Sequence, residues 1–339
     1  MQLSEPPRSY GNMQQLRIHV SIAVSVAAML VQHLAQTAQP SEPIVPIPAK
    51  IPGDAKRIAI GERLFHDDRM SKDRNESCAT CHPLDKGGMD SLPVAKRPDG
   101  SKHLRNTPTV FNVGLSATYN WDGIENTLEA HADRIVQTLM KMTWVELIAR
   151  LRADSAYVSS FEAAYEDGVT RANILDALAV FERSLLTPNS RFDRFLRNDH
   201  NAMTQRETRG YRLFKRYGCV TCHQGANMGG NLYQKFGVFE DVSKKNVAPL
   251  DRGRVRITNV PRDEYVFRVP SLRNVAVTAP YFHDGREQEL SKAVETMGKV
   301  QLGKALARED VDLIVEFLRT LTGEFRGSLV SAPSVEAKP

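Results

Sequence analysis

The stretches Cys78-Ala79-Thr80-Cys81-His82 and Cys219-Val220-Thr221-Cys222-His223 decide how this 339-residue chain is built. Each is a Cys-x-x-Cys-His run, the pattern at which c-type haem is attached. Two thiols can join the vinyl groups of one porphyrin when they stand one short turn apart, and the next His then offers a ring nitrogen to the iron. We therefore expect two covalent haems. Their tethers and proximal ligands would be Cys78, Cys81 and His82 in the first run, and Cys219, Cys222 and His223 in the second.

Other uses of the cysteines fit this pattern less well. The four cysteines of the chain all lie in the two runs. Two Cys-x-x-Cys pairs could hold a zinc ion, but zinc gives no reason for a His after each pair. A thioredoxin-like redox motif would occur once, near a β-α-β pattern. Two disulfides are a further alternative, although the cysteines of each pair are only three positions apart.

Length and composition favour two domains. A chain of 339 residues with 41% hydrophobic residues can form two ordinary cores, and each haem run would then have its own domain. The formal net charge of +5 is spread along the chain, so no basic arm for nucleic acid is expected. A charge of this size is compatible with an acidic protein partner or a membrane surface, and it also serves solubility.

The first residues have the features of a targeting segment. Arg8 and Arg17 precede an apolar run over residues 18–31, and Ala35-Gln36-Thr37-Ala38 resembles a small-residue cleavage site. We expect residues 1–38 to be a signal peptide, with a retained N-terminal anchor as the alternative. Either would place the protein in the periplasm, outside the cytoplasm, where c-type haem is attached. Residues 39–55 are rich in proline and form an extended leader.

An internal repeat predicts the fold. Gly61-Glu62-Arg63-Leu64-Phe65 precedes the first haem run, and Gly210-Tyr211-Arg212-Leu213-Phe214 precedes the second. The helical periodicity indicates a mainly α protein with long loops, little strand and two cytochrome c-like domains, each carrying one covalently bound c-type haem. The expected domains cover residues 56–200 and 201–326, followed by a flexible tail over 327–339.

Periodicity also predicts individual elements. Helices are expected over residues 127–150 and 156–186, and a short extended piece is expected around residues 265–269. A terminal amphipathic helix has Glu309 and Asp310 in its first turn and is predicted to end at Gly323.

Further motifs carry a family likeness. From about residue 56 to 324, the chain resembles the bacterial di-haem cytochrome c peroxidases and their relatives, which include the enzyme that matures the tryptophan-derived quinone of methylamine dehydrogenase. The matching stretches are Arg105-Asn106-Thr107-Pro108-Thr109, Trp121-Asp122-Gly123, Phe181-Glu182-Arg183-Ser184-Leu185, Pro270-Ser271-Leu272-Arg273-Asn274, residues 278–285, Met297-Gly298 and Gln301-Leu302-Gly303.

The resemblance implies roles for particular residues. The N-terminal haem would carry out the peroxide chemistry, and the C-terminal haem would take electrons from a small cytochrome or copper protein. Met297 matches the distal ligand of the C-terminal haem, and a thioether there raises the haem potential. Trp121 matches the Trp between the haems. A calcium ion would be held by Asn106, Thr278 and Pro280, through oxygen donors that suit a hard cation. Family members commonly form homodimers.

The chain departs from the family around the first haem. Pro98 stands where classical members have a loop His that covers the resting iron, and His103 is a nearby substitute. His131 replaces a distal Gln, and Lys141 replaces the catalytic Glu. A His can move a proton during peroxide cleavage, whereas a Lys does so only when its surroundings lower its pKa. We therefore expect His131 to be the distal acid and base. Two nearby carboxylates, Glu129 and Glu146, would enter if the alignment slipped.

Three functions are compatible with these residues. The first is a periplasmic peroxidase that reduces hydrogen peroxide with electrons entering through the C-terminal haem. The second is a di-haem oxidase that uses peroxide and a high-valent haem to oxidise Trp or Tyr side chains of a partner protein. The third is an electron-transfer cytochrome without peroxide turnover.

Overall fold

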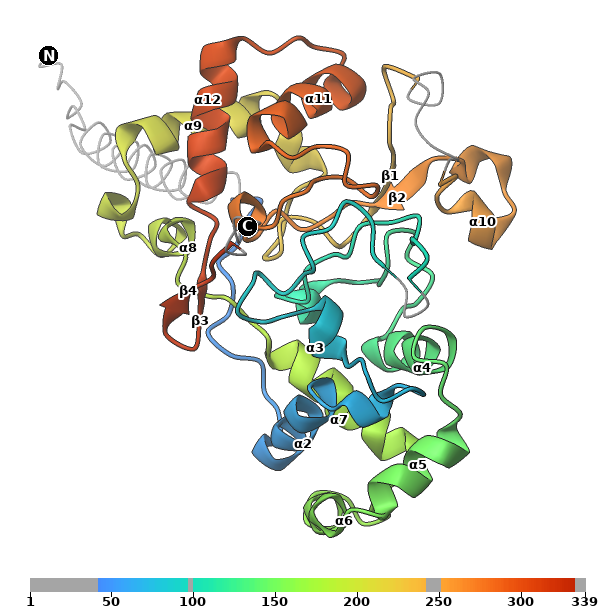
Figure 1. The fold of residues 1–339 in the computed structure, drawn as a ribbon. Coiled ribbons are helices and arrows are strands. Elements are labelled where there is room, and N and C mark those ends of the chain that lie inside the picture. Colours follow the sequence, from blue (N-terminus) through green and yellow to red (C-terminus); the bar gives the residue numbers. More distant parts are fainter. Residues whose placement is uncertain (1–41, 97–99, 242–250, 333–339) are drawn as a thin grey trace, which may run out of the picture. The chain divides into compact units, whose positions relative to one another are not determined.

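Two crossed helix pairs repeat along the chain, and each stands beside one haem run (Figure 1). The computed structural model describes residues 42–96, 100–241 and 251–332. In the first pair α2 (Ala55–Phe65) packs against α7 (Arg171–Ser184), and in the second α9 (Gln205–Arg216) packs against α12 (Arg308–Arg319). Each crossing depends on a glycine. A Cβ on Gly61 would lie 2.0 Å from the carbonyl oxygen of Ala177, and a Cβ on Gly210 would lie 2.0 Å from that of Leu313.

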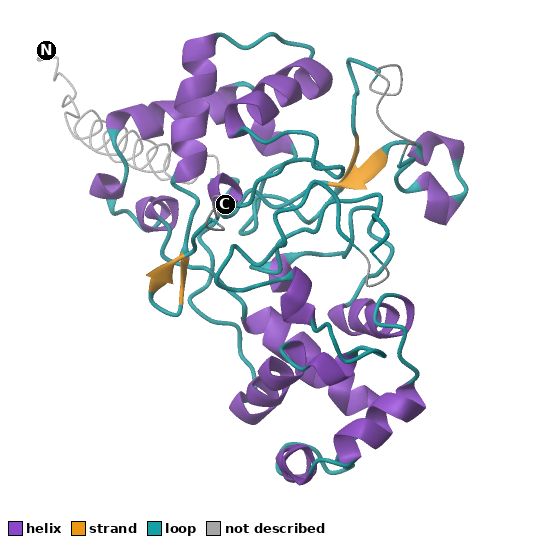
Figure 2. Ribbon diagram, viewed as in Figure 1, coloured by secondary structure: helices purple, strands orange, loops and turns teal. Residues whose placement is uncertain are grey.

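The remaining elements are short and separated by long loops, as Figure 2 shows. The other α-helices are α3 (Cys78–Cys81), α4 (Leu128–Thr138), α5 (Trp144–Arg152), α6 (Ser155–Glu162), α8 (Arg191–Leu196), α10 (Val255–Thr258) and α11 (Leu290–Leu302). Two antiparallel pairs make up the strands of the described residues: β1 (Tyr233–Lys235) with β2 (Val266–Arg268), and β3 (Glu324–Phe325) with β4 (Ser328–Leu329). The predictions of a mainly helical fold with little strand, and of an extended piece near residue 267, are confirmed.

Helix caps divide the two long helices that periodicity predicted. The expected helix over 127–150 is interrupted between Thr138 and Trp144, because Thr143 caps α5 by accepting a hydrogen bond from the Glu146 amide at 3.2 Å. The expected helix over 156–186 is likewise two helices. Thr170 caps the second of them, and Gly168 precedes it with φ +60°. Capping and a glycine turn outweigh the apolar period at these points.

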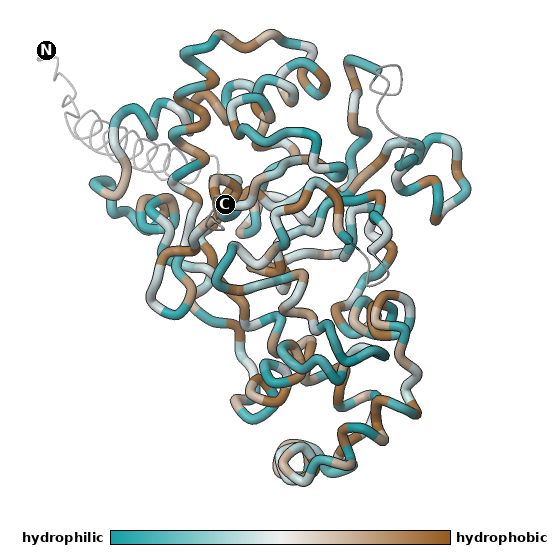
Figure 3. The backbone as a smooth tube through the Cα atoms, in the orientation of Figure 1, coloured by the Kyte–Doolittle hydropathy of each residue, from teal (hydrophilic) through white to brown (hydrophobic). Residues whose placement is uncertain are grey.

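The apolar faces of these helices form two cores, and hydrophobic and hydrophilic residues alternate along the helices in Figure 3. The first core is centred on α2, α4, α5, α6 and α7, and the second on α8, α9 and α12. The first and the last described segments each pack into the core formed mainly by the other half of the chain. Ile44 of the leader is buried in the second core, whereas Val330, beyond β4, is buried in the first.

The end of the chain differs from its prediction. Helix α12 stops at Arg319, so Gly323 does not cap it. Gly323 instead packs so closely on Thr187 that a Cβ would lie 1.9 Å from the Thr187 carbonyl oxygen. Residues 328–329, which were assigned to a flexible tail, form β4, and Val330 is buried. The packed chain therefore extends past the predicted boundary at residue 326.

The hydroxyl of Thr187 is shared by the two halves. Its oxygen accepts hydrogen bonds from the side-chain amides of Asn112, at 2.7 Å, and Asn274, at 3.0 Å. Both asparagines have left-handed backbones, with φ of 60° and 61°, and each precedes a short 3₁₀ helix. The equivalence of the two asparagines extends the repeat into the loops.

The predicted signal or anchor segment, residues 1–38, lies outside the described residues. Among the helices that the structure does describe, none is both long enough and apolar enough to span a membrane.

Candidate functional site

One large cavity brings the two haem runs together. Its volume is about 860 Å³, and both runs line it with their cysteine and histidine side chains. Phe65 of α2 and Phe214 of α9, from the two copies of the repeat, also line it. The apolar faces of the crossed helix pairs thus enclose a space that both Cys-x-x-Cys-His runs enter.

The two proximal histidines are held alike. His82 Nδ1 lies 3.1 Å from the Gly88 carbonyl oxygen, and His223 Nδ1 lies 3.1 Å from that of Met228. An Nδ1–H that donates to a carbonyl leaves Nε2 available for a metal. Burial lowers the pKa of His82, and it lowers that of His223 to about 4. Both rings are therefore neutral at pH 7, which is the form that binds iron.

The cysteines are arranged as haem tethers. No disulfide joins any two of the four, so the disulfide alternative is not supported. In the described ranges no group of three or more His, Cys, Asp or Glu side chains could hold a metal ion, which argues against a shared zinc.

Two equivalent helices present different side chains to the cavity. Ile135 is the eighth residue of α4, and Met297 is the eighth residue of α11. His131 and Ala293 are the fourth residues of the same helices. All four line the cavity. The second half therefore offers a thioether where the first offers only hydrocarbon, and the first half offers an imidazole where the second has a methyl group.

His131 is positioned by a buried polar group. Its Nδ1 lies 3.3 Å from the side-chain amide of Asn120 and 3.7 Å from Glu125 Oε2, and its ring stacks on Tyr119. Glu125 is buried and accepts a hydrogen bond from Asn120 at 2.7 Å. The sequence analysis missed Glu125. In the sequence, Glu125 could have been noticed because it closely follows the Trp121-Asp122-Gly123 turn. In the structure it forms a β-bridge with Tyr119, on the other side of that turn.

Trp121 and the expected calcium ligands surround the same cavity. Trp121 is buried and donates from Nε1 to the Asn106 carbonyl oxygen at 2.9 Å. Its ring lies 6.3 Å from that of His283. Asn106, Thr278 and Pro280 also line the cavity, so residues far apart in sequence converge there.

Other predicted residues lie elsewhere. Lys141 is exposed in the turn between α4 and α5, with φ +53°, and does not line the cavity. Glu129 pairs with Arg183 at 2.8 Å, and Glu146 bonds Thr143 at 2.9 Å, both outside the cavity lining. His103 does line it. Pro98 lies outside the described residues.

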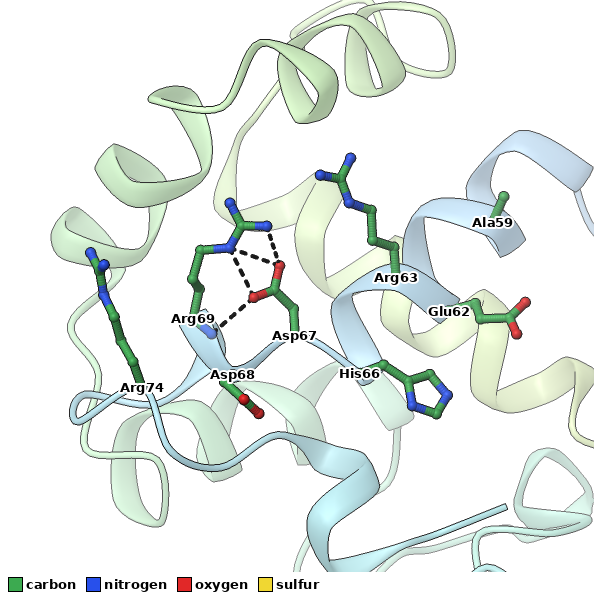
Figure 4. A pocket seen from close by; sticks show the side chains of 8 residues that line it. All are labelled: Ala59, Glu62, Arg63, His66, Asp67, Asp68, Arg69 and Arg74. Carbon is green, nitrogen blue, oxygen red and sulfur yellow. Dashed lines mark hydrogen bonds and ion pairs between the residues drawn. The ribbon is translucent and has the colours of Figure 1, made fainter. Parts of the chain in front are cut away.

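A second hollow, of about 620 Å³, is separate from the haem runs (Figure 4). Arg63, Arg69 and Arg74 line it, together with His66 and Asp67. Arg69 pairs with Asp67 at 2.7 Å and with Asp154 at 2.9 Å, so this guanidinium is neutralised within the protein. We therefore assign this hollow no role in the chemistry of the larger cavity.

Comparisons with known proteins agree with this geometry. Residues 55–201 match the family model described as di-haem cytochrome c peroxidase. The chain is 41% identical to the cytochrome c551 peroxidase of Nitrosomonas europaea over 84% of this chain and 85% of that protein. The chain belongs to the di-haem cytochrome c peroxidase family. Named members of this family are haem peroxidases, and the family implies two haems.

Two further relatives span different shares of their own length. The cytochrome c peroxidase Ccp of Escherichia coli (strain K12) is 42% identical over 84% of this chain, which spans only 62% of that protein. A crystal structure of a MauG-like protein associated with microbial copper homeostasis superposes with a TM-score of 0.72 and 26% identity, covering 85% of this chain and 95% of the other.

A buried arginine supports the fit of haem to the cavity. Arg268 is buried and lines the cavity, and burial lowers its pKa to about 10. Its Nε donates to the Asn120 carbonyl oxygen at 2.9 Å, but within the described residues it forms no ion pair. A buried cation of this kind needs an anion, and a haem propionate would provide one. Together with two available histidine Nε2 atoms and four thiols, the donor set fits two c-type haems.

Proposed function

We propose that this protein is a periplasmic di-haem peroxidase that reduces hydrogen peroxide to water. Peroxide would react in the first half, and electrons would enter through the second half from a small cytochrome or copper protein. The observation that carries the proposal is the contrast between the equivalent positions Ile135 and Met297. Ile135 in the first half would leave room for a small substrate at an iron bound by His82. Met297 in the second half would offer a thioether to an iron bound by His223 and would favour a high potential.

The protein's residues would divide the work. Bound haem supplies the redox chemistry, with His82 and His223 as proximal ligands and the four cysteines as tethers. Trp121, packed between the two halves, lies on a short route for electrons. Each H₂O₂ takes up two electrons and two protons and yields two waters. His131 lines the cavity, and we assign it the proton transfers.

Other parts of the proposal concern assembly and location. The oxygen atoms of Asn106, Thr278 and Pro280 would hold a calcium ion beside Trp121. Residues 1–38 would direct the chain to the periplasm, either as a cleaved signal or as an anchor. A homodimer is the expected assembly, and each half is proposed to be one cytochrome c-like domain.

The test mixes purified holoprotein with hydrogen peroxide and a reduced small cytochrome, and follows cytochrome oxidation and the haem spectra together. We expect rapid oxidation of two cytochromes per peroxide. The second candidate function, oxidation of Trp or Tyr side chains in a partner protein, would show a long-lived spectral change with little turnover. Trp121 at the edge of the cavity favours this second candidate. An unchanged spectrum would leave only electron transfer.

His131→Ala tests the assignment of the proton transfers. Loss of a positioned acid and base should slow the reaction with peroxide by about 10²- to 10⁴-fold in stopped-flow measurements. His200→Ala changes an exposed histidine outside the cavity and should react like the wild type. A rate for His131→Ala equal to that of the control would remove His131 from the mechanism.

A further inference from the structure

Comparison of the two helix crossings points to a cavity-lining carboxyl group that has no role in the mechanism proposed above. Phe181 of α7 lies against Gly61 in the first helix crossing, and Phe317 of α12 lies against Gly210 in the second. The next residues, Glu182 and Leu318, are therefore equivalent, and both line the cavity. The second half closes this part of its wall with hydrocarbon, whereas the first half places an ionisable group there.

Glu182 is buried without a partner that would neutralise it. It is 9% exposed, and among the described residues none forms a hydrogen bond or ion pair with its carboxyl group. The adjacent Arg183 is directed to Glu129 instead, at 2.8 Å. A structural glutamate in such a place would be expected to have a hydrogen-bonding partner. Glu182 lines the cavity, so this side chain borders the proposed reaction space.

The electrostatic surroundings make this carboxyl group able to gain and lose a proton. Burial raises the pKa of Glu182 to about 7, and the nearby His131 and Arg183 oppose the rise. Glu129 raises it further, and the Tyr119 hydroxyl is a further titratable neighbour. Cys78 also lies near, but as a haem tether it would not titrate. Efficient acid–base groups have pKa values near the working pH.

We propose that Glu182 exchanges protons with His131 during peroxide reduction, in place of the catalytic glutamate that the family has at the position of Lys141. This inference rests on the proposed function. For each peroxide, two electrons come from the donor protein and two protons come from solvent. Glu182 passes a proton to His131 and is reprotonated, so the carboxyl group is unchanged after the cycle. Lys141 cannot take this part because it is exposed outside the cavity.

The experiment compares Glu182→Gln and Glu182→Leu with wild type. The glutamine keeps the shape of the side chain, and the leucine copies the residue of the second half. Stopped-flow rates for peroxide are measured from about pH 5 to 9, after haem absorbance has shown that each variant carries two haems. We expect the wild-type rate to change with one ionisation near pH 7. Both variants should lose that ionisation and react at least about 10-fold more slowly. Glu162→Gln, at an exposed position of α6 and outside the cavity, should keep the wild-type profile.

An infrared measurement gives a readout besides activity. Difference spectra between low and high pH should contain the carbonyl band of a protonated buried carboxyl group, absent from Glu182→Gln and present in Glu162→Gln. Wild-type reactivity combined with an unaltered pH profile in Glu182→Gln would overturn the inference and leave the proposed function standing. A wild-type protein inert to peroxide would overturn the proposed function itself. Should Glu182→Gln fail to assemble, the leucine variant and the wild-type infrared titration decide the matter.

Discussion

Single side chains distinguish the two haem pockets. Three pairs of equivalent positions differ: His131 and Ala293, Ile135 and Met297, and Glu182 and Leu318. In each pair, one residue carries a functional group and the other carries only hydrocarbon. The functional group suits the chemistry proposed for the half in which it lies. The two residues proposed to exchange protons belong to the first half, and the residue proposed as a soft ligand belongs to the second. The scaffold is shared, so the difference in function is attributed to these few residues.

The charge of Glu182 should appear in the pH dependence of stability. Its pKa in the folded protein is about 7, above the ordinary value of 4.5. The folded state thus holds the proton after the unfolded state has lost it, and stability falls as pH rises from about 4.5 to 7. Glu182→Gln should therefore be more stable than wild type at pH 8, by roughly 1–3 kcal/mol, and nearly equal to it at pH 4.

Guanidinium unfolding of the holoproteins at the two pH values measures this difference. A stability difference of the same size at pH 4 and pH 8 would show that Glu182 does not titrate as described.

The residues that the sequence reveals at once are those with a fixed local spacing. The iron ligands and tethers belong to this class, because haem attachment constrains five consecutive residues. Glu182 and Glu125 do not, because the place of Glu182 depends on which face of α7 meets the cavity, and that of Glu125 on a loop that folds back to Tyr119. Lys141 shows the converse error. The resemblance to the family assigned it to the position of a catalytic Glu, but in the turn after α4 it is exposed.

At the scale of elements, the two helix crossings are the features that fix each pocket. Gly61 and Gly210 allow the backbones of crossed helices to approach, which sets the register of α7 and α12 against the cavity. The sequence predicted the four helices and the repeated glycine. It did not predict the breaks at Thr143 and Thr170, since the apolar period continues across them. Nor could it pair β1 with β2, which are distant in the chain.

Gly61→Ala tests the first crossing. The new Cβ would lie 2.0 Å from the Ala177 carbonyl oxygen, and neither backbone can yield without separating the helices. We expect a loss of about 1–3 kcal/mol or more of unfolding free energy, measured by denaturant titration, together with a disturbed spectrum of the first haem. Ala59→Ser, at an exposed position of the same helix, should have little effect. Wild-type stability in Gly61→Ala would show that the crossing tolerates a wider separation.

On the scale of the whole molecule, each half of the chain is stabilised by a segment from the other end. The leader inserts Ile44 into the second core, and its Ile47 amide donates to Asp193, which pairs with the fully buried Arg273 at 2.9 Å. The end of the chain returns Val330 to the first core. Thr187 joins the two equivalent asparagines. These ties hold both haem runs against one cavity.

The most direct test of this account is the number and axial ligation of the haems in the purified protein. Near-infrared magnetic circular dichroism and pyridine haemochrome analysis should show two haems per chain, one with a His and Met ligand pair and one without a protein ligand opposite its His. Met297→Leu should remove the Met signature and leave the other haem unchanged, whereas Met142→Leu, in the first core and outside the cavity, should retain it. One haem per chain, an imidazole opposite His223, or a protein ligand on both sides of each iron would contradict the account.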